Sequence, residues 1–332
     1  LPLATTAAKV AGMALAVGQS RRGCATTADI SIIAGEVRQL TEAVRVQLAD
    51  DDGELGDPPP TSAAPRLVFS PHHPSLVLRL ITPACELYRS DEAAARAACG
   101  GELPFWGFLW PGGYAIARYL ADAAAVAAQK TPSRGWRQAP VSTGYGSSGG
   151  GSWSARGRAV LDLGCGSGVG GVAAHLLHGA APVLANDIDA TALVASEVNW
   201  YANGARRDHL TLLPVDLLGR PPATSLAPYL PPAASLRDLL VLVGDVAYDA
   251  DIATAVLQWL CAAVSHGATV IIGDPGRTAF NTAAAATLVP RTGAAFTLRE
   301  LATYPLPPRL SLENATFATA GVLQLVPAAT AS

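Results

Sequence analysis

Residues 159–171 read Ala-Val-Leu-Asp-Leu-Gly-Cys-Gly-Ser-Gly-Val-Gly-Gly, and this run decides the fold of the 332-residue chain. The stretch Val160–Leu163 is apolar except for Asp162, which is typical of a buried parallel strand, and the glycines after it let the backbone approach a ligand. A helix is predicted over 172–178 and a second strand over 182–185, followed by Asp187. This order indicates a nucleotide-binding βαβ unit with Asp187 placed to bind ribose hydroxyls.

The glycine spacing leaves the nucleotide open. Gly166, Gly168 and Gly171 satisfy the G-x-G-x-x-G pattern of dinucleotide sites, with an acid at about the distance expected for NAD. However, Asp162 lies just before the glycine turn, where a carboxylate suits the ammonium of a methionine moiety and would repel a pyrophosphate. We therefore favour S-adenosylmethionine over NAD.

Composition sets the broad class. Half of the residues are hydrophobic, so a full core is available, and the formal net charge of −3 gives no broad basic field that would favour nucleic acid. The five cysteines lack C-x-x-C or Cys/His ligand spacing, which is typical of reduced, buried thiols. No apolar run approaches the roughly 20 residues that span a bilayer. We expect a monomer without a metal ion, membrane span or nucleic-acid partner.

Residues 1–28 contain no acidic residue, and Lys9, Arg21 and Arg22 lie there among Ala, Thr, Ser and Gly. This composition favours an organellar transit peptide, with the mitochondrion expected and the chloroplast as an alternative. Two other interpretations stay open. Residues 10–17 resemble the core of a weak secretory signal, and the segment is also compatible with a disordered tail of a cytoplasmic protein.

Residues 29–103 are predicted to form a helical accessory segment before the main domain, residues 104–327. Within it, 30–48 has the apolar spacing of one helix face, 76–81 fits a short strand and 91–99 a short helix. Two stretches without periodicity, 130–158 and 219–236, are interpreted as flexible insertions.

A loop dense in aromatic residues, Leu103 to Gly113, precedes a predicted helix over 114–129. Loops seldom carry this much aromatic surface unless it packs on something. The loop is either a plug over the core or a lid over a ligand pocket. The lid is favoured because the helix that the loop starts leads directly to the glycine run.

Strand-like and helix-like runs alternate through the main domain. This pattern predicts an α/β, Rossmann-like fold with a mostly parallel seven-stranded sheet and helices on both faces. Further strands are predicted over 210–215, 239–243 and 268–272, and the runs 295–301 and 321–326 would close the sheet as a hairpin. Five strands carry an acid at or near their ends, which predicts a shared polar rim: Asp162, Asp187, Asp216, Asp245 and Asp274.

Taken together, these residues resemble the class I, seven-strand S-adenosylmethionine methyltransferases. Asp245-x-x-Tyr248 is similar to the mark of the protein-lysine methyltransferases among them. Several runs resemble the family of electron transfer flavoprotein β-subunit lysine methyltransferases, over about residues 76–326. These runs are Leu78–Pro83, Trp106 with Trp110–Gly113, Leu184–Asp189, Gly244-Asp245 with Tyr248-Asp249, and Gly273–Arg277.

The resemblance implies an S-adenosylmethionine-dependent protein-lysine N-methyltransferase that acts on an organellar protein such as electron transfer flavoprotein β subunit. Asp245 would orient the incoming ammonium, and Tyr248, with Trp106, would form an aromatic wall that tolerates a cation. Asp274 and Arg277 would contact the substrate, although Arg277 is also placed to pair with Asp245 or Asp274. The cofactor would be held by Trp110, Asp162, Gly164, Gly166, Gly168, Asp187, Asp216 and Gly244.

Two further functions stay open. In the first, the chain methylates another protein, of the ribosomal type, or a small molecule, since methyltransferases for these acceptors share the same cofactor residues. A non-catalytic binding protein with the same fold is the alternative from another class, and it predicts cofactor binding without transfer.

Overall fold

The computed structural model describes residues 34–35, 37–47, 55–56, 75–99, 101–129, 155, 157–231, 234–288, 296–307, 310 and 317–328. The expected transit peptide and most of the expected insertion over 130–158 lie outside these ranges.

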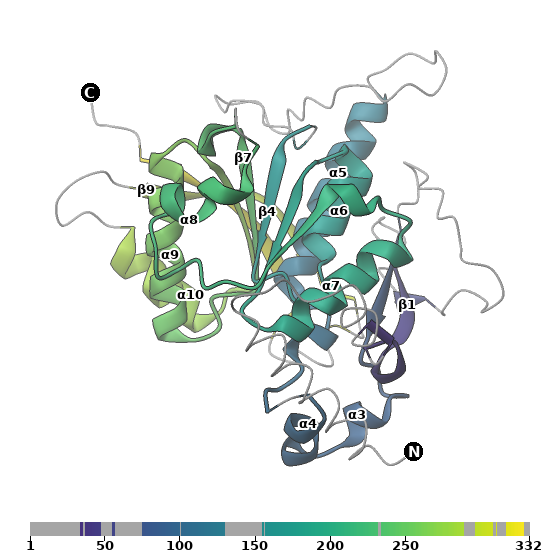
Figure 1. Cartoon of the computed structure of the whole chain (residues 1–332). Coiled ribbons are helices and arrows are strands. Elements are labelled where there is room, and N and C mark those ends of the chain that lie inside the picture. Colours follow the sequence, from purple (N-terminus) through teal and green to yellow (C-terminus); the bar gives the residue numbers. More distant parts are fainter. Residues whose placement is uncertain are drawn as a thin grey trace.

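Seven strands form one sheet in the order β6-β5-β4-β7-β8-β10-β9 (Figure 1). The five strands β6, β5, β4, β7 and β8 run parallel to one another. The strand β10 is antiparallel to both β8 and β9. The predicted Rossmann-like sheet and its closing hairpin are therefore confirmed. The strands are β4 (Ala159–Leu163), β5 (Val183–Asn186), β6 (Leu210–Leu213), β7 (Leu239–Gly244), β8 (Thr269–Asp274), β9 (Phe296–Pro305) and β10 (Thr319–Pro327).

Helices cover both faces of this sheet (Figure 1). One face carries α5 (Pro111–Gln129), α6 (Val169–His178) and α7 (Ala190–Ala202), and the other carries α8 (Pro222–Leu226), α9 (Ala250–Ser265) and α10 (Thr278–Thr287). Successive side chains of β4 point to opposite faces of the sheet. Val160 packs in the core with α5 and α6, whereas Leu161 and Leu163 pack in the core with α9. The helix α10 is an element that the sequence pattern did not predict.

The accessory segment contains strands as well as helices. Residues 37–40 are helical, but β1 (Glu42–Gln47) pairs antiparallel with β2 (Leu55–Gly56) and β3 (Ser75–Leu80). The predicted helix over 30–48 is therefore wrong beyond residue 40, because pairing with the distant β3 outweighs the local apolar spacing. Two short helices follow, α3 (Glu86–Arg89) and α4 (Glu92–Ala98).

The stretch 219–236 also differs from the prediction of a structureless insertion. It holds α8 and a 3-10 turn over Ala227–Tyr229, and Leu226 is fully buried in the core beside α9. The prolines of this stretch argued against a helix, but Pro222 lies in the first turn of α8, where a proline is tolerated. No helix within the described ranges combines the length and apolar character needed to cross a membrane.

Candidate active site

The glycine turn after β4 has the conformation that only glycine adopts readily. Gly164, Gly166 and Gly168 have φ angles of 64°, 49° and 77°. A side chain at Gly168 would meet Ser196 of α7, and one at Gly164 would meet Val246. Among the described residues, only the Trp106 Cα lies within 4 Å of a Cβ atom added at Gly166, at 3.9 Å, so they leave open space at the middle of the turn. The turn therefore has room for a ligand at its centre.

Asp162 lies beneath the first turn of α6, on the face of β4 that also carries Val160. Its Oδ2 atom accepts a hydrogen bond of 2.7 Å from the Gly171 N–H, and burial raises the pKa of the carboxyl to about 7. The observed contact joins strand to helix. Its predicted role toward a methionine ammonium stays a prediction.

Asp187 follows β5 and faces the glycine turn. Its two carboxylate oxygens accept from the N–H groups of Gly166 and Asp189, each at 3.0 Å. Burial raises the pKa of Asp187 to about 6. Beside it, Ile188 is 80% exposed and offers an apolar surface that the sequence reading overlooked. Together these two residues offer acceptors and an apolar face next to the turn.

Asp216 lies beyond β6 at the same edge of the sheet. It is exposed, and its Oδ1 atom accepts from the Leu218 N–H at 2.9 Å, which closes a local turn. Among the predicted cofactor residues it is the one with the most solvent around it, in keeping with a position at the rim.

Gly244 ends β7 where the sheet meets the start of α5. A Cβ atom there would lie 2.9 Å from the Gly113 backbone, and a Cβ atom at Gly273 of β8 would collide with the Gly112 carbonyl. These glycines bring the N-terminus of α5 against the ends of β7 and β8. Trp110 precedes this helix and therefore reaches the same edge.

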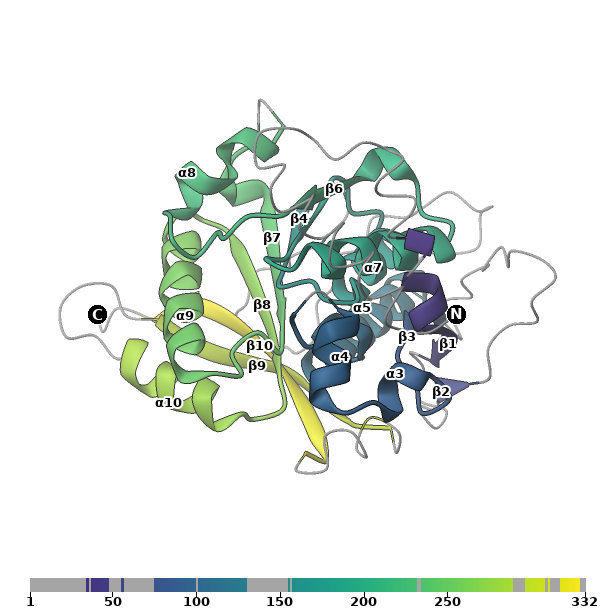
Figure 2. The same cartoon turned by 60° about the horizontal axis from the view of Figure 1, so that its bottom comes forward.

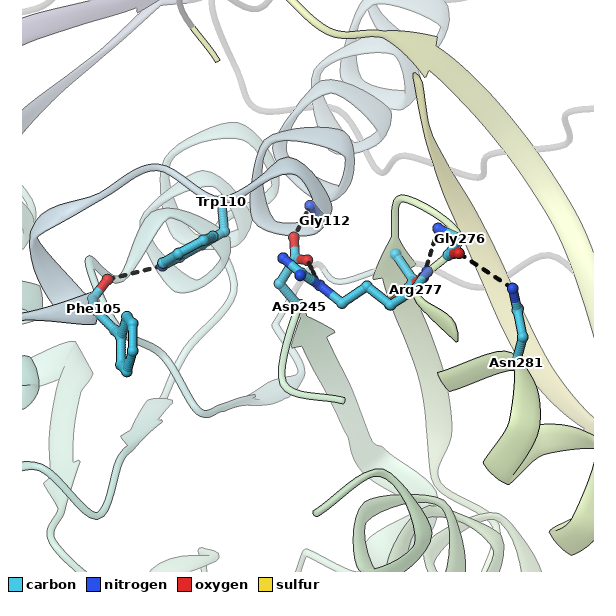
Figure 3. A network of polar contacts seen from close by, with 8 residues as sticks. Phe105, Trp110, Gly112, Asp245, Gly276, Arg277 and Asn281 are labelled. Atoms are coloured by element: carbon cyan, nitrogen blue, oxygen red, sulfur yellow. Dashed lines mark hydrogen bonds and ion pairs between the residues drawn. The ribbon is translucent and has the colours of Figure 1, made fainter. Parts of the chain in front are cut away.

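Asp245 is the centre of a polar network at this edge (Figure 3). Its backbone has a left-handed φ of 59°, which non-glycine residues rarely adopt, and its side chain is buried. One carboxylate oxygen accepts from the Gly112 N–H, and the other forms an ion pair of 2.6 Å with Arg277 Nε. Burial raises the pKa of Asp245, while Arg277 and the Gly112 N–H oppose that rise.

Arg277 is fixed from several sides. Its guanidinium carbon lies 5.8 Å from the centre of the Trp110 ring and 5.4 Å from that of Phe317. Asp274 is buried and accepts from the N–H groups of Gly276 and Arg277 at 2.7 and 2.8 Å, so it shapes the turn that presents Arg277. Burial raises the pKa of Asp274 to about 6. Its observed contacts are therefore to its own turn, and its predicted contact with substrate stays a prediction.

Tyr248 and Phe105 form the exposed aromatic part of the site. Tyr248 is 56% exposed, and its ring centre lies 6.2 Å from that of Phe105, which in turn lies 6.0 Å from that of Trp110. The Trp110 indole N–H donates to the Phe105 carbonyl at 2.8 Å (Figure 3). Aromatic rings thus lie beside Tyr248, with Phe105 among them, and their role toward a substrate cation stays a prediction.

Trp106 is the predicted substrate residue that the structure places elsewhere. It is only 2% exposed and packs in a core cluster with Ile81 and residues of α7 such as Ala195 and Val198. The prediction of an aromatic wall at Trp106 is therefore wrong. Trp106 instead anchors the loop over 103–113, and this leaves its neighbour Phe105 facing outward.

The chain matches the family model of the ribosomal protein L11 methyltransferases over residues 152–223. It is 33% identical over 217 residues to the electron transfer flavoprotein β subunit lysine methyltransferase of Xenopus laevis, which covers 64% of this chain and 67% of that protein. A homologue from Caenorhabditis elegans is 28% identical over 253 residues, which cover 76% of this chain and 88% of that protein.

Among solved structures, a ribosomal protein L11 methylase from Lactobacillus delbrueckii subsp. bulgaricus is 20% identical over 51% of this chain and 69% of that chain, with a TM-score of 0.29. The sequence relatives are much closer than this, and the alignment with the Xenopus laevis protein spans about two thirds of both chains. That alignment, on a sheet with the glycine turn and acidic edge described above, places the chain in the family of electron transfer flavoprotein β subunit lysine methyltransferases.

Proposed function

We propose that this methyltransferase transfers methyl groups from S-adenosylmethionine to lysine side chains of an electron transfer flavoprotein β subunit. The single observation that carries the proposal is the juxtaposition of Asp245, Tyr248 and Trp110 at the same sheet edge as the glycine turn. A methyl acceptor at this edge would meet an acid and aromatic rings beside the cofactor.

The residues present suit this cofactor. Open space at Gly166, the free lone pairs of Asp187 and the exposed Ile188 would receive the amino-acid part, the ribose hydroxyls and the purine ring in turn. When bound, S-adenosylmethionine supplies a methyl group on a positively charged sulfur. The chain's own part is to align the acceptor nitrogen with that methyl group and to exclude water around it.

The acceptor lysine must lose a proton before it attacks, since its reference pKa is near 10.4. A free carboxylate would hold the ammonium in its charged form, but Asp245 is already paired with Arg277. The Asp245–Arg277 pair therefore orients the amine without strongly raising its pKa. Water accepts the proton.

A transfer assay tests the proposal. The full chain is incubated with labelled S-adenosylmethionine and purified electron transfer flavoprotein β subunit, and the modified residue is identified by mass spectrometry. We expect label on lysine. If the chain bound S-adenosylhomocysteine but labelled no protein, it would be a binding protein with this fold.

The variant Asp245→Asn sharpens the assay, because asparagine tolerates a left-handed backbone and still accepts from Gly112. Loss of the charge should lower transfer by about 100-fold or more while the affinity for S-adenosylhomocysteine stays unchanged. The matched control is Asp208→Asn, which removes an exposed carboxylate from the opposite edge of the sheet. Undiminished transfer by Asp245→Asn would remove Asp245 from the acceptor site.

The ribosomal-type alternative is not favoured. The L11 methyltransferase model matches residues 152–223, which hold the glycine turn and Asp187 but end before Asp245 and Tyr248. That match therefore concerns the cofactor half and is silent on the acceptor.

We also propose a mitochondrial location, which the acid-free composition of residues 1–28 supports. Fusion of these residues to a fluorescent protein tests it. Mitochondrial fluorescence is expected, and chloroplast or cytosolic fluorescence would contradict the proposal.

A further inference from the structure

Five aromatic rings form an unbroken row across the acceptor edge. Each ring contacts the next, with successive centres 6.4, 6.1, 6.0 and 6.2 Å apart. The row starts on α3 in the accessory segment, follows the loop before α5 and ends in the loop after β7. Figure 2 shows α4 in front of α5, beside the strands of the sheet, with α3 next to it. The members in order are Tyr88, Phe108, Trp110, Phe105 and Tyr248.

The row is the main exposed apolar surface of the described residues. Four large hydrophobic side chains are exposed within those ranges, and three of them belong to the row: Tyr88 at 40%, Phe105 at 51% and Tyr248 at 56%. The fourth, Ile188, lies beside Asp187. Isolated apolar side chains are normal on a protein surface, but aromatic rings gathered at one place mark an interaction site.

The surroundings of the row are acidic. Burial raises the pKa of the Tyr248 phenol, and the nearby charges of Asp187, Asp249 and Glu102 raise it further. Near the middle and the Tyr248 end of the row, Arg277 pairs with Asp245, and Arg96 pairs with Glu92 and lies 3.7 Å from Glu102. Arg89, next to Tyr88 on α3, donates to the Ala84 carbonyl, so its charge stays at the other end of the row. The chain has only two lysines, Lys9 and Lys130, and both lie outside the described ranges. A partner should therefore supply cations to the Tyr248 end of this surface.

The spacing of the rings indicates the shape of that partner. Alternate side chains of an extended segment lie about 6.5 Å apart, on the same face of the backbone. The rings recur at 6.0 to 6.4 Å, so each would meet one side chain of such a segment. Apolar side chains and the stems of lysines both pack well on aromatic rings.

We propose that the row from Tyr88 to Tyr248 is the docking surface for an extended segment of the protein substrate in which every second side chain, the set that faces the rings, is apolar or lysine. This inference rests on the proposed function and adds to it, since it names the kind of segment that carries the acceptor lysine. It also gives the accessory helix α3 a part in substrate selection.

Peptide binding tests the surface without any transfer. Two short labelled peptides, one repeating Leu-Ser-Lys-Ser and one repeating Leu-Ser-Glu-Ser, are titrated into the full chain with S-adenosylhomocysteine present, so that Leu and the charged residue share one face. We expect the Lys peptide to bind about tenfold or more tightly than the Glu peptide. Tyr88→Ala should weaken binding of the Lys peptide by about three- to tenfold, and Tyr88→Phe, which keeps the ring, should restore it. Asp208→Asn is the control for charge.

Steady-state transfer to electron transfer flavoprotein β subunit gives the second readout. Tyr88→Ala should raise the KM for this protein by a similar factor and leave kcat and the KM for S-adenosylmethionine unchanged. If the subunit is not methylated but the peptides bind as stated, the proposed substrate fails and the docking surface stands. Equal binding of the two peptides, or no effect of Tyr88→Ala on either readout, overturns the docking surface.

Discussion

Asp245 combines three features that seldom occur together: a left-handed backbone, a buried carboxylate and an ion pair with Arg277. Backbone strain of this kind is kept only where the surroundings fix it, and it gathers at functional sites. Here the Gly112 N–H and Arg277 hold the two oxygens. The strain and the buried charge both point to a residue selected for its chemistry.

Asp162 gives a prediction on pH. Its folded-state pKa of about 7 lies above the ordinary 3.8, so the folded chain binds a proton that the unfolded chain releases. The free energy of unfolding should therefore fall as the pH rises through this window, with the whole cost present above about pH 7. In Asp162→Asn the amide oxygen still accepts from Gly171, and this dependence disappears.

Urea unfolding of both chains between about pH 4 and about pH 8 measures the effect. The stability of Asp162→Asn relative to the wild type should increase with pH by up to about 4 kcal/mol, because each pKa unit corresponds to about 1.4 kcal/mol. A difference that stays constant with pH would show that Asp162 is not protonated in the folded chain.

At this scale the sequence predicted residue types better than orientations. The acids and the glycines were singled out by their positions after strands, and Tyr248 by the resemblance of Asp245-x-x-Tyr248 to a methyltransferase motif. Trp106 was misplaced, because Phe105 and Trp106 are adjacent aromatics in a loop without periodicity, and only packing against α7 decides which of them is buried. Ile188 was missed for the same reason. The sequence did predict that Arg277 could pair with Asp245 or Asp274, and the structure shows the pair with Asp245.

At the scale of elements, α7 acts as a clamp between the glycine turn and the accessory sheet. Asn203 takes up both the N–H and the carbonyl of Val77 in β3, and Asn199 accepts from the Arg79 N–H. Asn199 also donates to the Ser167 carbonyl within the glycine turn. The two amides replace a neighbouring strand along this edge of β3.

Asn203→Ala should open this edge. The variant leaves the buried N–H and carbonyl of Val77 without a partner, which costs about 3 kcal/mol of unfolding free energy. Hydrogen exchange at β3 should accelerate. Asn281→Ala, which removes an exposed amide from the Gly276 carbonyl, should leave exchange in β3 unchanged. Slow exchange of β3 in Asn203→Ala would mean that pairing with β1 alone secures the strand.

Strands with a continuous apolar run could be predicted from the sequence, whereas a strand that forms by pairing with a segment far along the chain could not. The strands β4, β5, β7 and β8 lie close to their expected bounds, because fully buried parallel strands appear as short apolar runs. The segment of β1 was predicted as a helix, since the spacing of its apolar residues fits the period of an α-helix as well as that of a β-strand. Its partner β3 is about 30 residues away along the chain, so the pairing leaves no local signal.

At the scale of the whole molecule, the site depends on how closely α5 approaches the sheet. Gly112 and Gly113 meet Gly244 and Gly273 backbone to backbone. This contact holds the Gly112 N–H against Asp245 and keeps Trp110 beside Arg277. The sequence predicted the common edge of the strands from its acids. The helix contact was not predicted, because it joins segments more than 100 residues apart.

Gly273→Ala tests this dependence. Its Cβ atom would collide with the Gly112 carbonyl, and neither backbone has a flexible side chain that could give way, so α5 must shift. Overpacking of this kind should cost about 3 kcal/mol of unfolding free energy, and the shift should weaken the bond from the Gly112 N–H to Asp245.

Gly35→Ala is the matched control, because no atom lies within 4 Å of its added Cβ and alanine favours the helical backbone there. It should leave the stability unchanged or raise it by up to about 1 kcal/mol. Urea unfolding compares the two variants, and transfer to the protein substrate reports on the site. If Gly273→Ala kept both stability and transfer, the approach of α5 would be adjustable, and Arg277 and the Gly273 carbonyl would suffice to position Asp245.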